Sequence, residues 1–256
     1  MLISLEYLIK KYNLNITGVS HFGAHLGQEV EKYIKNNIKN INLYEPQQSV
    51  YKKLYEKYNK YEFISFFNFG LGSENSNQIL NVEKDNEGQS SSILRPARHL
   101  DFYPNINFDH NEKIQIRRYE ELDIQNVNLL NIDIQGYELE ALKGCGDKLH
   151  NVDYIIIEIN RDLLYENNPL VQDIDFFLQE YDFIRSESRW ASTRLPFGDA
   201  FYIKRKYLTR GRIIFSQIKI KLQNIKLYYL FIDPYRKTKK FIYNLKKKIA
   251  LIIRAN

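Results

Sequence analysis

The chain alternates short apolar runs with longer segments in which apolar residues recur every three or four positions. The runs have the length of strands, and the clearest, Val152–Ile159, is rich in β-branched residues, as in strands covered on both faces. The periodic segments have the spacing of amphipathic helices. The predicted strands are Ile16–Phe22, Ile41–Glu45, Tyr61–Phe69, Val127–Asp133, Val152–Ile159, Tyr181–Ser186 and Asp199–Lys204. The predicted helices between them are Leu26–Asn37, Val50–Tyr58 and Leu170–Glu180.

This alternation predicts an α/β fold built on a mostly parallel sheet. The connection Arg194–Gly198 is short, which allows the last strand to pair antiparallel with the strand before it. A long insertion separates the third and fourth strands, and insertions of this length are usually functional or mobile. We expect it to contain the short strands Ile79–Val82, Ser91–Leu94 and Lys113–Arg117. We also expect a polar loop, Ala97–Glu112, as a candidate acceptor-binding lid, with the polar residues His99, Asp101, Tyr103, Asp109 and His110.

Charge is divided unevenly along the chain. Residues 204–256 contain 16 Lys or Arg and one acid, a net charge of +15, and residues 1–203 contain 21 basic and 30 acidic residues, a net charge of −9. The two parts together give the formal charge of +6. We therefore divide the chain into a domain of residues 1–204 and a basic helical extension of residues 205–256. Only the extension suits a polyanionic partner such as a membrane surface or nucleic acid.

Two segments of the extension are apolar and basic. Asp233 and Pro234 are typical of a helix start, and apolar residues follow them at helical spacing between lysines. Ile213–Ile232 has a similar composition. Such helices fit peripheral contact with an anionic membrane surface, and a helical hairpin packed on the domain or on a second subunit fits equally well.

Several features bear on the cellular setting. The single cysteine, Cys145, excludes a disulfide framework and a cysteine-based metal site, and it favours a reducing, cytoplasmic setting. Glu6 interrupts the first apolar run, so the N-terminal segment predicts a short amphipathic helix and not a secretory signal. No run approaches the roughly 18 apolar residues of a membrane span.

The most informative segment is Asn131–Gly144. An apolar strand ends at Asp133, the chain turns at Gly136, and a helix begins near Glu138. Ligands of open α/β sheets bind at this edge, so both acids are candidate catalytic residues, and Glu158 in the next strand is a third. Glu138 could instead stabilise the positive end of its own helix.

A second candidate lies in the loop His21–Gly27. Gly23 and Gly27 allow the backbone to approach a ligand closely and to turn into a helix, but their spacing differs from that of dinucleotide binders. Glu45 follows at about the offset at which an acid holds ribose hydroxyls in nucleotide-binding folds. Asn68, near the end of the third strand, could hydrogen-bond an adenine edge or satisfy local backbone.

In their order along the chain, these motifs resemble the FkbM-type methyltransferases. The matching segments are Gly-Ala-His-Leu-Gly at 23–27, Tyr-Glu-Pro at 44–46, Gly-x-Ser-Ser-Ser at 88–92, Asp-Ile-Gln-Gly-Tyr-Glu at 133–138, Ile-Ile-Ile-Glu at 155–158 and Gly-Asp-Ala-Phe-Tyr-Ile-Lys at 198–204. The resemblance implies a class I, Rossmann-like fold and transfer of a methyl group from S-adenosylmethionine to a hydroxyl, mostly of a sugar or natural product. One position departs from the family, which mostly has Asp where this chain has His21.

The resemblance also implies roles for the candidate residues. The cofactor would be bound by His21, Gly23, Ala24, Gly27, Glu45, Asn68 and Asp133. The protein must align an acceptor oxygen with the activated methyl and remove the hydroxyl proton. Asp133 is our first choice for that base, and Glu138 and Glu158 follow. These three acids and His21 could instead hold a divalent ion, but their spacing is not a recognised ligand set, so no metal is predicted.

Other interpretations stay open at this point. Trp190 could stack on a sugar ring or pack in the core, and Asp199 could reach the acceptor or cap a turn. One rival function is an RNA methyltransferase recruited by the basic extension, which the acidity of the domain disfavours. Another is a catalytically inactive cofactor-binding module, a reading raised by His21.

Overall fold

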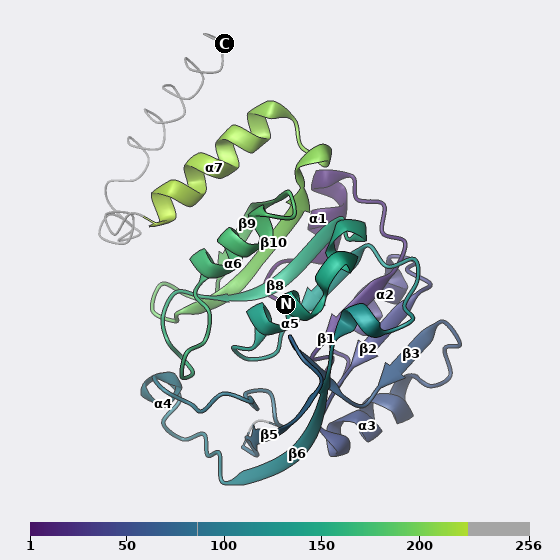
Figure 1. Cartoon of the computed structure of the whole chain (residues 1–256), viewed down its shortest axis with the longest axis vertical. Coiled ribbons are helices and arrows are strands. Elements are labelled where there is room, and N and C mark those ends of the chain that lie inside the picture. The colour runs from purple at the N-terminus through teal and green to yellow at the C-terminus, as the bar shows by residue number, and fades with distance from the viewer. Residues whose placement is uncertain (86, 225–256) are drawn as a thin grey trace.

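The computed structural model describes residues 1–85 and 87–224, and within them a main sheet has the strand order β3-β2-β1-β7-β8-β10-β9 (Figure 1). The strands are, in sheet order, β3 (Ile64–Phe67), β2 (Ile41–Tyr44), β1 (Val19–Phe22), β7 (Leu129–Ile132), β8 (Tyr154–Asn160), β10 (Phe197–Lys204) and β9 (Phe183–Trp190). Strands from β3 to β8 pair in parallel, and β10 runs antiparallel to both of its neighbours. The predicted mostly parallel sheet with an antiparallel last strand is confirmed.

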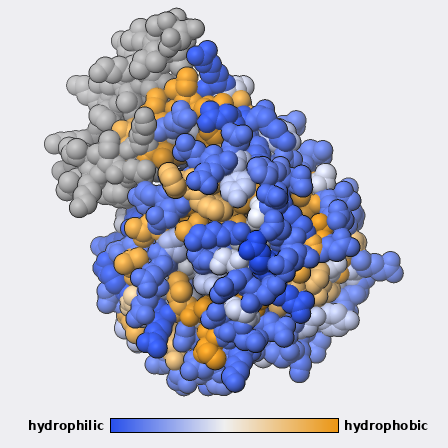
Figure 2. Space-filling view, viewed as in Figure 1, coloured by the Kyte–Doolittle hydropathy of each residue, from blue (hydrophilic) through white to orange (hydrophobic). Residues whose placement is uncertain are grey.

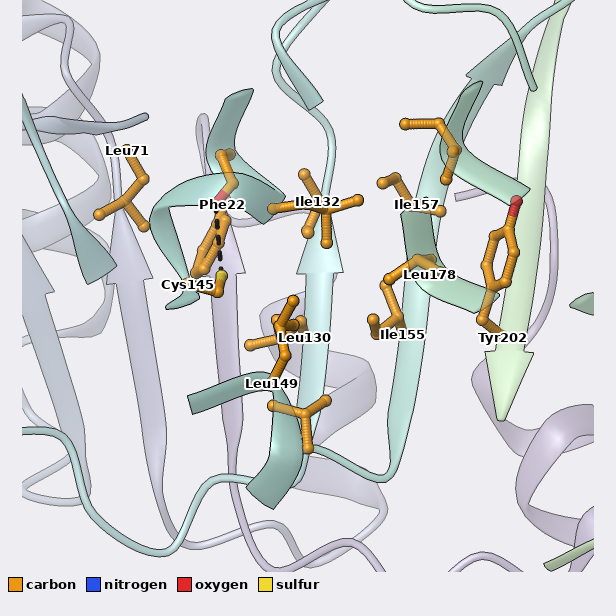
Figure 3. Packing of buried hydrophobic residues seen from close by; sticks show 14 of the residues in the cluster. Phe22, Leu71, Leu130, Ile132, Cys145, Leu149, Ile155, Ile157, Leu178 and Tyr202 are labelled. Carbon is orange, nitrogen blue, oxygen red and sulfur yellow. Dashed lines mark hydrogen bonds between the residues drawn. The ribbon is translucent and has the colours of Figure 1, made fainter. Parts of the chain in front are cut away.

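Helices cover both faces of this sheet. Their bounds are α1 (Leu5–Tyr12), α2 (Val30–Lys35), α3 (Gln48–Tyr58), α4 (His99–Phe102), α5 (Glu138–Gly144), α6 (Val171–Gln179) and α7 (Arg210–Asn224). Short 3₁₀ helices lie at η1 (Tyr119–Glu121), η2 (Gly146–Asn151) and η3 (Arg205–Tyr207). One hydrophobic cluster joins the sheet to α1, α2 and α3. The other joins it to α5 and α6, where Leu130 and Ile132 of β7 lie beside Ile155 and Ile157 of β8 (Figure 3). Because side chains alternate along a strand, each central strand contributes to both clusters.

The insertion before β7 forms a second, smaller sheet in the order β4 (Gly70–Leu71), β6 (His110–Arg117) and β5 (Ser76–Val82). Two of the three predicted extra strands are therefore confirmed as parts of β5 and β6. The third, Ser91–Leu94, is wrong, because the side-chain amide of Asn81 donates to the carbonyls of this segment, which forms only an isolated bridge with the sheet. The predicted polar loop 97–112 is also interrupted, by α4 and by the start of β6.

Two predicted elements are shorter than expected near the carboxyl edge of the sheet. The helix expected from Leu26 begins only at Val30, because His25 and Gly27 adopt left-handed backbone conformations with φ of 46° and 73°. The third strand is confined to Ile64–Phe67. Beyond it, the amide of Asn68 donates to the backbone carbonyls of Glu45 and Pro46, and the chain turns into the small sheet.

The described part of the C-terminal extension is α7, which packs along β9. Figure 2 shows a mainly hydrophilic face of the molecule, with apolar residues gathered near α7. Phe215 of α7 is half exposed. The division of the chain at Lys204 stays a prediction, and the helix expected from Asp233 lies outside the described residues. Over those residues, none of the helices combines the length and the apolar character that crossing a bilayer requires.

Candidate active site

The glycine loop and Glu45 are held together by backbone hydrogen bonds at the carboxyl edge of β1 and β2. The amides of Gly23 and Ala24 donate to the Tyr44 carbonyl at 3.0 and 2.9 Å. The two oxygens of Glu45 accept the amides of His25 and Gln47 at 2.9 and 2.8 Å. Since each oxygen has a fixed donor, the Glu45 carboxylate is oriented before any ligand arrives.

Gly23 is required by the close approach of two backbone segments. Its φ is +79°, and an added Cβ would lie 2.0 Å from the Asp133 carbonyl oxygen. Gly27 has a different role, since a Cβ there would meet Tyr58 and Leu54 of α3 at 2.5 and 2.8 Å. The first glycine therefore shapes the site, and the second allows the loop to pack against a helix.

A first cavity opens beside Glu45, which is 6% exposed. Its apolar wall comes largely from the small sheet, through Leu80, Ile114 and Ile116. Burial in this surrounding raises the pKa of the Glu45 carboxyl to about 7. An apolar wall beside a carboxylate suits a nucleoside, whose base is largely apolar on its faces and whose ribose carries hydroxyl donors.

A second cavity, of about 660 Å³, adjoins the first, and Gly23 and Asp133 line both. His21 of β1 and Glu158 of β8 also line it. Because β-strand side chains alternate, the polar residues at 21, 133 and 158 point to the same side of the sheet, next to the cluster that contains α2. Asp199 of β10 pairs with Glu158 across the antiparallel ladder and completes this row.

Gln135 links the two acids that line this cavity. Its amide nitrogen donates to Asp133 Oδ1 at 2.8 Å and to Glu158 Oε2 at 3.1 Å. Burial, and then the neighbouring Asp133, raises the pKa of Glu158 well above its usual range. Glu158 therefore holds a proton more strongly than an ordinary glutamate carboxyl group does. Gln135 was not singled out from the sequence, although it lies inside the predicted motif.

His21 is a neutral imidazole whose tautomer is set by its neighbours. Burial lowers the pKa of His21 to about 4. The Tyr33 hydroxyl accepts from the Asn131 amide at 2.6 Å, which leaves its own proton available to His21 Nδ1 at 3.3 Å. With that donation the ring proton lies on Nε2, and His21 can serve as a hydrogen-bond donor.

Glu138 has its carboxyl group turned toward the backbone of the predicted motif. Its Oε1 accepts the amides of Ile134 and Gly136 at 3.2 and 2.9 Å, and burial raises its pKa to about 7. Among the described residues, neither cavity is lined by Glu138. These hydrogen bonds hold the loop between Asp133 and α5 in place. This role resembles the alternative in which Glu138 stabilises the positive end of its own helix.

The other candidate residues are placed as follows. Ala24 and Asn68 do not appear among the described residues that line the two cavities, and the Asn68 amide is used by local backbone. Trp190 packs at the edge of the core, with the Arg161 guanidinium 5.0 Å from its ring centroid. Asp199 accepts the backbone amides of Leu2 and Ile3. In the part of the chain that is described, no group of three or more His, Cys, Asp or Glu side chains is arranged to hold a metal.

Comparison with known proteins supplies the identity that this geometry suggests. The model of the methyltransferase FkbM domain matches residues 21–185, more than half of the chain. The chain belongs to the FkbM methyltransferase family. Membership in this family is what the ordered motifs predicted.

Individual relatives of this FkbM methyltransferase are distant. The 2-O-methyltransferase NoeI of Sinorhizobium fredii is 26% identical over 99 residues, which are 37% of this chain and 41% of NoeI. Solved structures include magnesium protoporphyrin IX methyltransferase from Synechocystis with bound cofactor, with a TM-score of 0.46, 9% identity and coverage of 78% of this chain and 75% of that one. TrmK of M. capricolum, in complex with S-adenosylhomocysteine, has a TM-score of 0.44 and 14% identity, with 99% of each chain covered.

Proposed function

We propose that this FkbM methyltransferase transfers the methyl group to a hydroxyl of a sugar, a glycan or a related small molecule. The observation that supports this most is the acid pair Asp133 and Glu158, which share the amide of Gln135 and line a cavity adjoining the Glu45 pocket. A hydroxyl must lose its proton as it is methylated, and a carboxylate beside a protonated partner can take it. The printed name of NoeI, a 2-O-methyltransferase, supports oxygen as the acceptor atom.

The residues of the first cavity fit the nucleoside part of S-adenosylmethionine. Glu45 uses one lone pair on each oxygen for a backbone amide, and a carboxylate offers roughly four such sites, so two remain for ribose hydroxyls. The apolar side chains of Leu80, Ile114 and Ile116 can contact an adenine ring. When bound, the cofactor supplies an activated methyl group.

The acceptor side of the mechanism is carried by the second cavity. Asp133 lines both cavities, so its carboxylate lies where donor and acceptor would meet, and we assign to it removal of the hydroxyl proton. Gln135 fixes the orientation of this carboxylate. Glu158, kept protonated by burial, lowers the negative charge that the site must hold before reaction. His21 is assigned a donor role toward the cofactor or acceptor.

The RNA methyltransferase alternative has less support in the site. Among the described residues, the second cavity is lined by Glu29, Asp133 and Glu158 and by no Lys or Arg side chain. A polyanionic acceptor would therefore meet the Asp133 carboxylate and no Lys or Arg side chain that could compensate its charge. The described part of the basic extension packs on the domain, where Lys219 pairs with Glu187 at 3.7 Å. This packing supports the helical-hairpin interpretation for residues 210–224, and membrane contact is then proposed only for the residues that follow.

Transfer of a labelled methyl group tests this proposal. The full chain is incubated with S-adenosylmethionine carrying a ¹³C methyl group and with separate acceptors, namely a panel of methyl glycosides and total RNA. We expect a ¹³C signal at the shift of an O-methyl ether on a glycoside, absent in Asp133→Asn. Label on nitrogen or in RNA alone would contradict the proposal, and failure to bind S-adenosylhomocysteine in calorimetry would favour an inactive module.

A further inference from the structure

One wall of the second cavity comes from the insertion and has no part in the mechanism described so far. We define the α4 wall as His99, Tyr103 and Ile106, which line this cavity together with Asp133 and Glu158. The Glu158 carboxylate is near enough to Tyr103 to add to the effect of burial, which raises the pKa of that phenol. The α4 wall therefore faces the space in which the acceptor would lie.

The α4 wall is anchored to the body of the enzyme by its backbone. The amides of Ala97 and His99 both donate to the Leu164 carbonyl at 2.9 Å, and the Arg98 amide donates to the Leu163 carbonyl at 3.2 Å. Residues 163–164 follow β8, the strand that carries Glu158. The same segment thus positions the α4 wall relative to the acid pair, which a loosely attached loop would not achieve.

His99 is the polar group of the α4 wall without an internal partner. It is 3% exposed, and its ring packs against Tyr103, Phe108 and Tyr165 at centroid distances of 5.1, 5.5 and 5.4 Å. Its Nδ1 is buried and has no hydrogen-bond partner among the described residues. Burial lowers the pKa of His99, so the imidazole is neutral at pH 7. Buried polar groups without partners are uncommon in native proteins, and the residue that carries this one lines the cavity beside the acid pair.

The charges around the cavity restrict what this wall can bind. The lining contains three carboxyl groups, and the Met1 ammonium that also lines it is paired with Glu29 at 3.0 Å. Asp133 then keeps its charge, and no Lys or Arg side chain is among the described residues that line the cavity, so an anionic acceptor is disfavoured. A neutral ring that carries several hydroxyls would match an aromatic face, an imidazole and carboxylates, because its hydroxyls donate and accept while its C–H faces contact rings.

We propose that the α4 wall determines acceptor specificity, with His99 hydrogen-bonding a hydroxyl of a neutral carbohydrate and Tyr103 stacking on its ring. This inference rests on the proposed function and adds to it the residues that select the acceptor. The methylated hydroxyl is then the one that reaches Asp133 when a neighbouring part of the ring is held by His99. The sequence pointed to the loop that carries His99 and Tyr103 as a candidate acceptor-binding lid, but it did not distinguish these two residues from the other polar residues of the loop.

The test compares matched histidine variants of the full chain. His99→Phe keeps the ring that packs against Tyr103 and removes its hydrogen-bonding atoms, and His99→Gln restores an amide donor and acceptor. His150→Phe is the control, because His150 also packs on a tyrosine, Tyr181 at 5.2 Å, but precedes β8 at the opposite edge of the sheet. Transfer to the best methyl glycoside of a panel (glucose, galactose, mannose, rhamnose and fucose) gives KM and kcat, and calorimetry gives the affinity for S-adenosylhomocysteine.

We expect KM for the glycoside to rise about tenfold in His99→Phe, the loss typical of one hydrogen bond, and to return to within threefold of wild type in His99→Gln. The affinity for S-adenosylhomocysteine should stay within twofold in all variants, as should KM in His150→Phe. An unchanged KM in His99→Phe would overturn the proposal that the α4 wall determines acceptor specificity, and it would leave the proposed function unaffected. If the wild-type protein fails to bind S-adenosylhomocysteine in calorimetry, the result would instead count against the proposed function itself.

A second measurement covers variants that fail to fold. The chain has five histidines, and their ring ¹H–¹³C signals in the wild-type protein loaded with S-adenosylhomocysteine can be followed as the glycoside is added. We expect the His99 signal to move and the His150 signal to stay. A bound glycoside that leaves His99 unmoved, or a panel in which no glycoside binds, overturns the proposal.

Discussion

The hydrogen bonds of Glu45 make Glu45→Gln a sharp test of the cofactor pocket. In the wild type both carboxylate oxygens accept a backbone amide, from His25 and from Gln47. A glutamine has one oxygen and one NH₂ group, so one of the two buried amides would face another donor. The variant therefore loses the negative charge and also disturbs the orientation of the side chain that would hold the ribose.

The expected loss follows from the kind of hydrogen bond removed. Hydrogen bonds to a charged group contribute about 1.5–3 kcal/mol, so losing about 2 kcal/mol corresponds to roughly a 30-fold weaker binding of S-adenosylhomocysteine. The effect should depend on pH. Burial raises the pKa of Glu45 to about 7 in the free protein, and binding favours the ionised form, so wild-type affinity should fall as the pH drops below about 7. The affinity of Glu45→Gln should change little over the same range.

Calorimetric titration with S-adenosylhomocysteine at pH 8 and pH 5.5 measures both effects. Glu112→Gln is a matched control, because Glu112 also accepts a backbone amide near the start of α3, from Gln48 at 2.9 Å, but is not among the described residues that line the cavities. The control should bind within twofold of wild type. If folded Glu45→Gln binds as tightly as wild type at pH 8, the assignment of the ribose site is refuted.

Three further predictions follow from the acid pair and the core. Asp133→Asn should lower kcat by about 100-fold or more in the methyl-transfer assay while S-adenosylhomocysteine affinity stays within threefold, and a kcat above a tenth of wild type would contradict its role as base. Gln135→Ala removes an amide that stabilises the ionised form of the acid pair, so the acidic limb of the pH–kcat profile should move to higher pH; an unmoved limb would show that Gln135 has no such effect. Leu130→Ala empties a fully buried position and should lower the free energy of unfolding by about 2–5 kcal/mol in urea titration, and a loss below about 1 kcal/mol would mean that the core there is loosely packed.

The main strands and their mostly parallel pairing could be predicted from sequence, because parallel strands buried on both faces leave a strong signal, whereas the strand order was not predicted. Val152–Ile159 is such a run, and it coincides with most of β8. Strand alternation also explains why His21, Asp133 and Glu158 lie on one side of the sheet. In each strand, the residue two positions before the polar one points to that same side. The sequence motifs named these three residues as candidates, and the structure adds that all three line one cavity.

Elements governed by side-chain hydrogen bonds could not be predicted in this way. Ser91–Leu94 has the composition of a strand, but the Asn81 amide takes three of its carbonyls. The role of Gln135 depends on how its left-handed backbone, with φ of 54°, aims the amide at two acids that are far apart in sequence. His99 is brought to the cavity by contacts with residues after β8, a long-range placement that local patterns do not encode.

A crystal structure of the full chain with S-adenosylhomocysteine tests the central claim most directly. The account predicts ribose hydroxyls within hydrogen-bond distance of Glu45, the adenine against Leu80 and Ile114, and the sulfur where the two cavities meet beside Asp133. A ligand bound elsewhere, or a Glu45 carboxylate that makes no contact with the ribose, would contradict it.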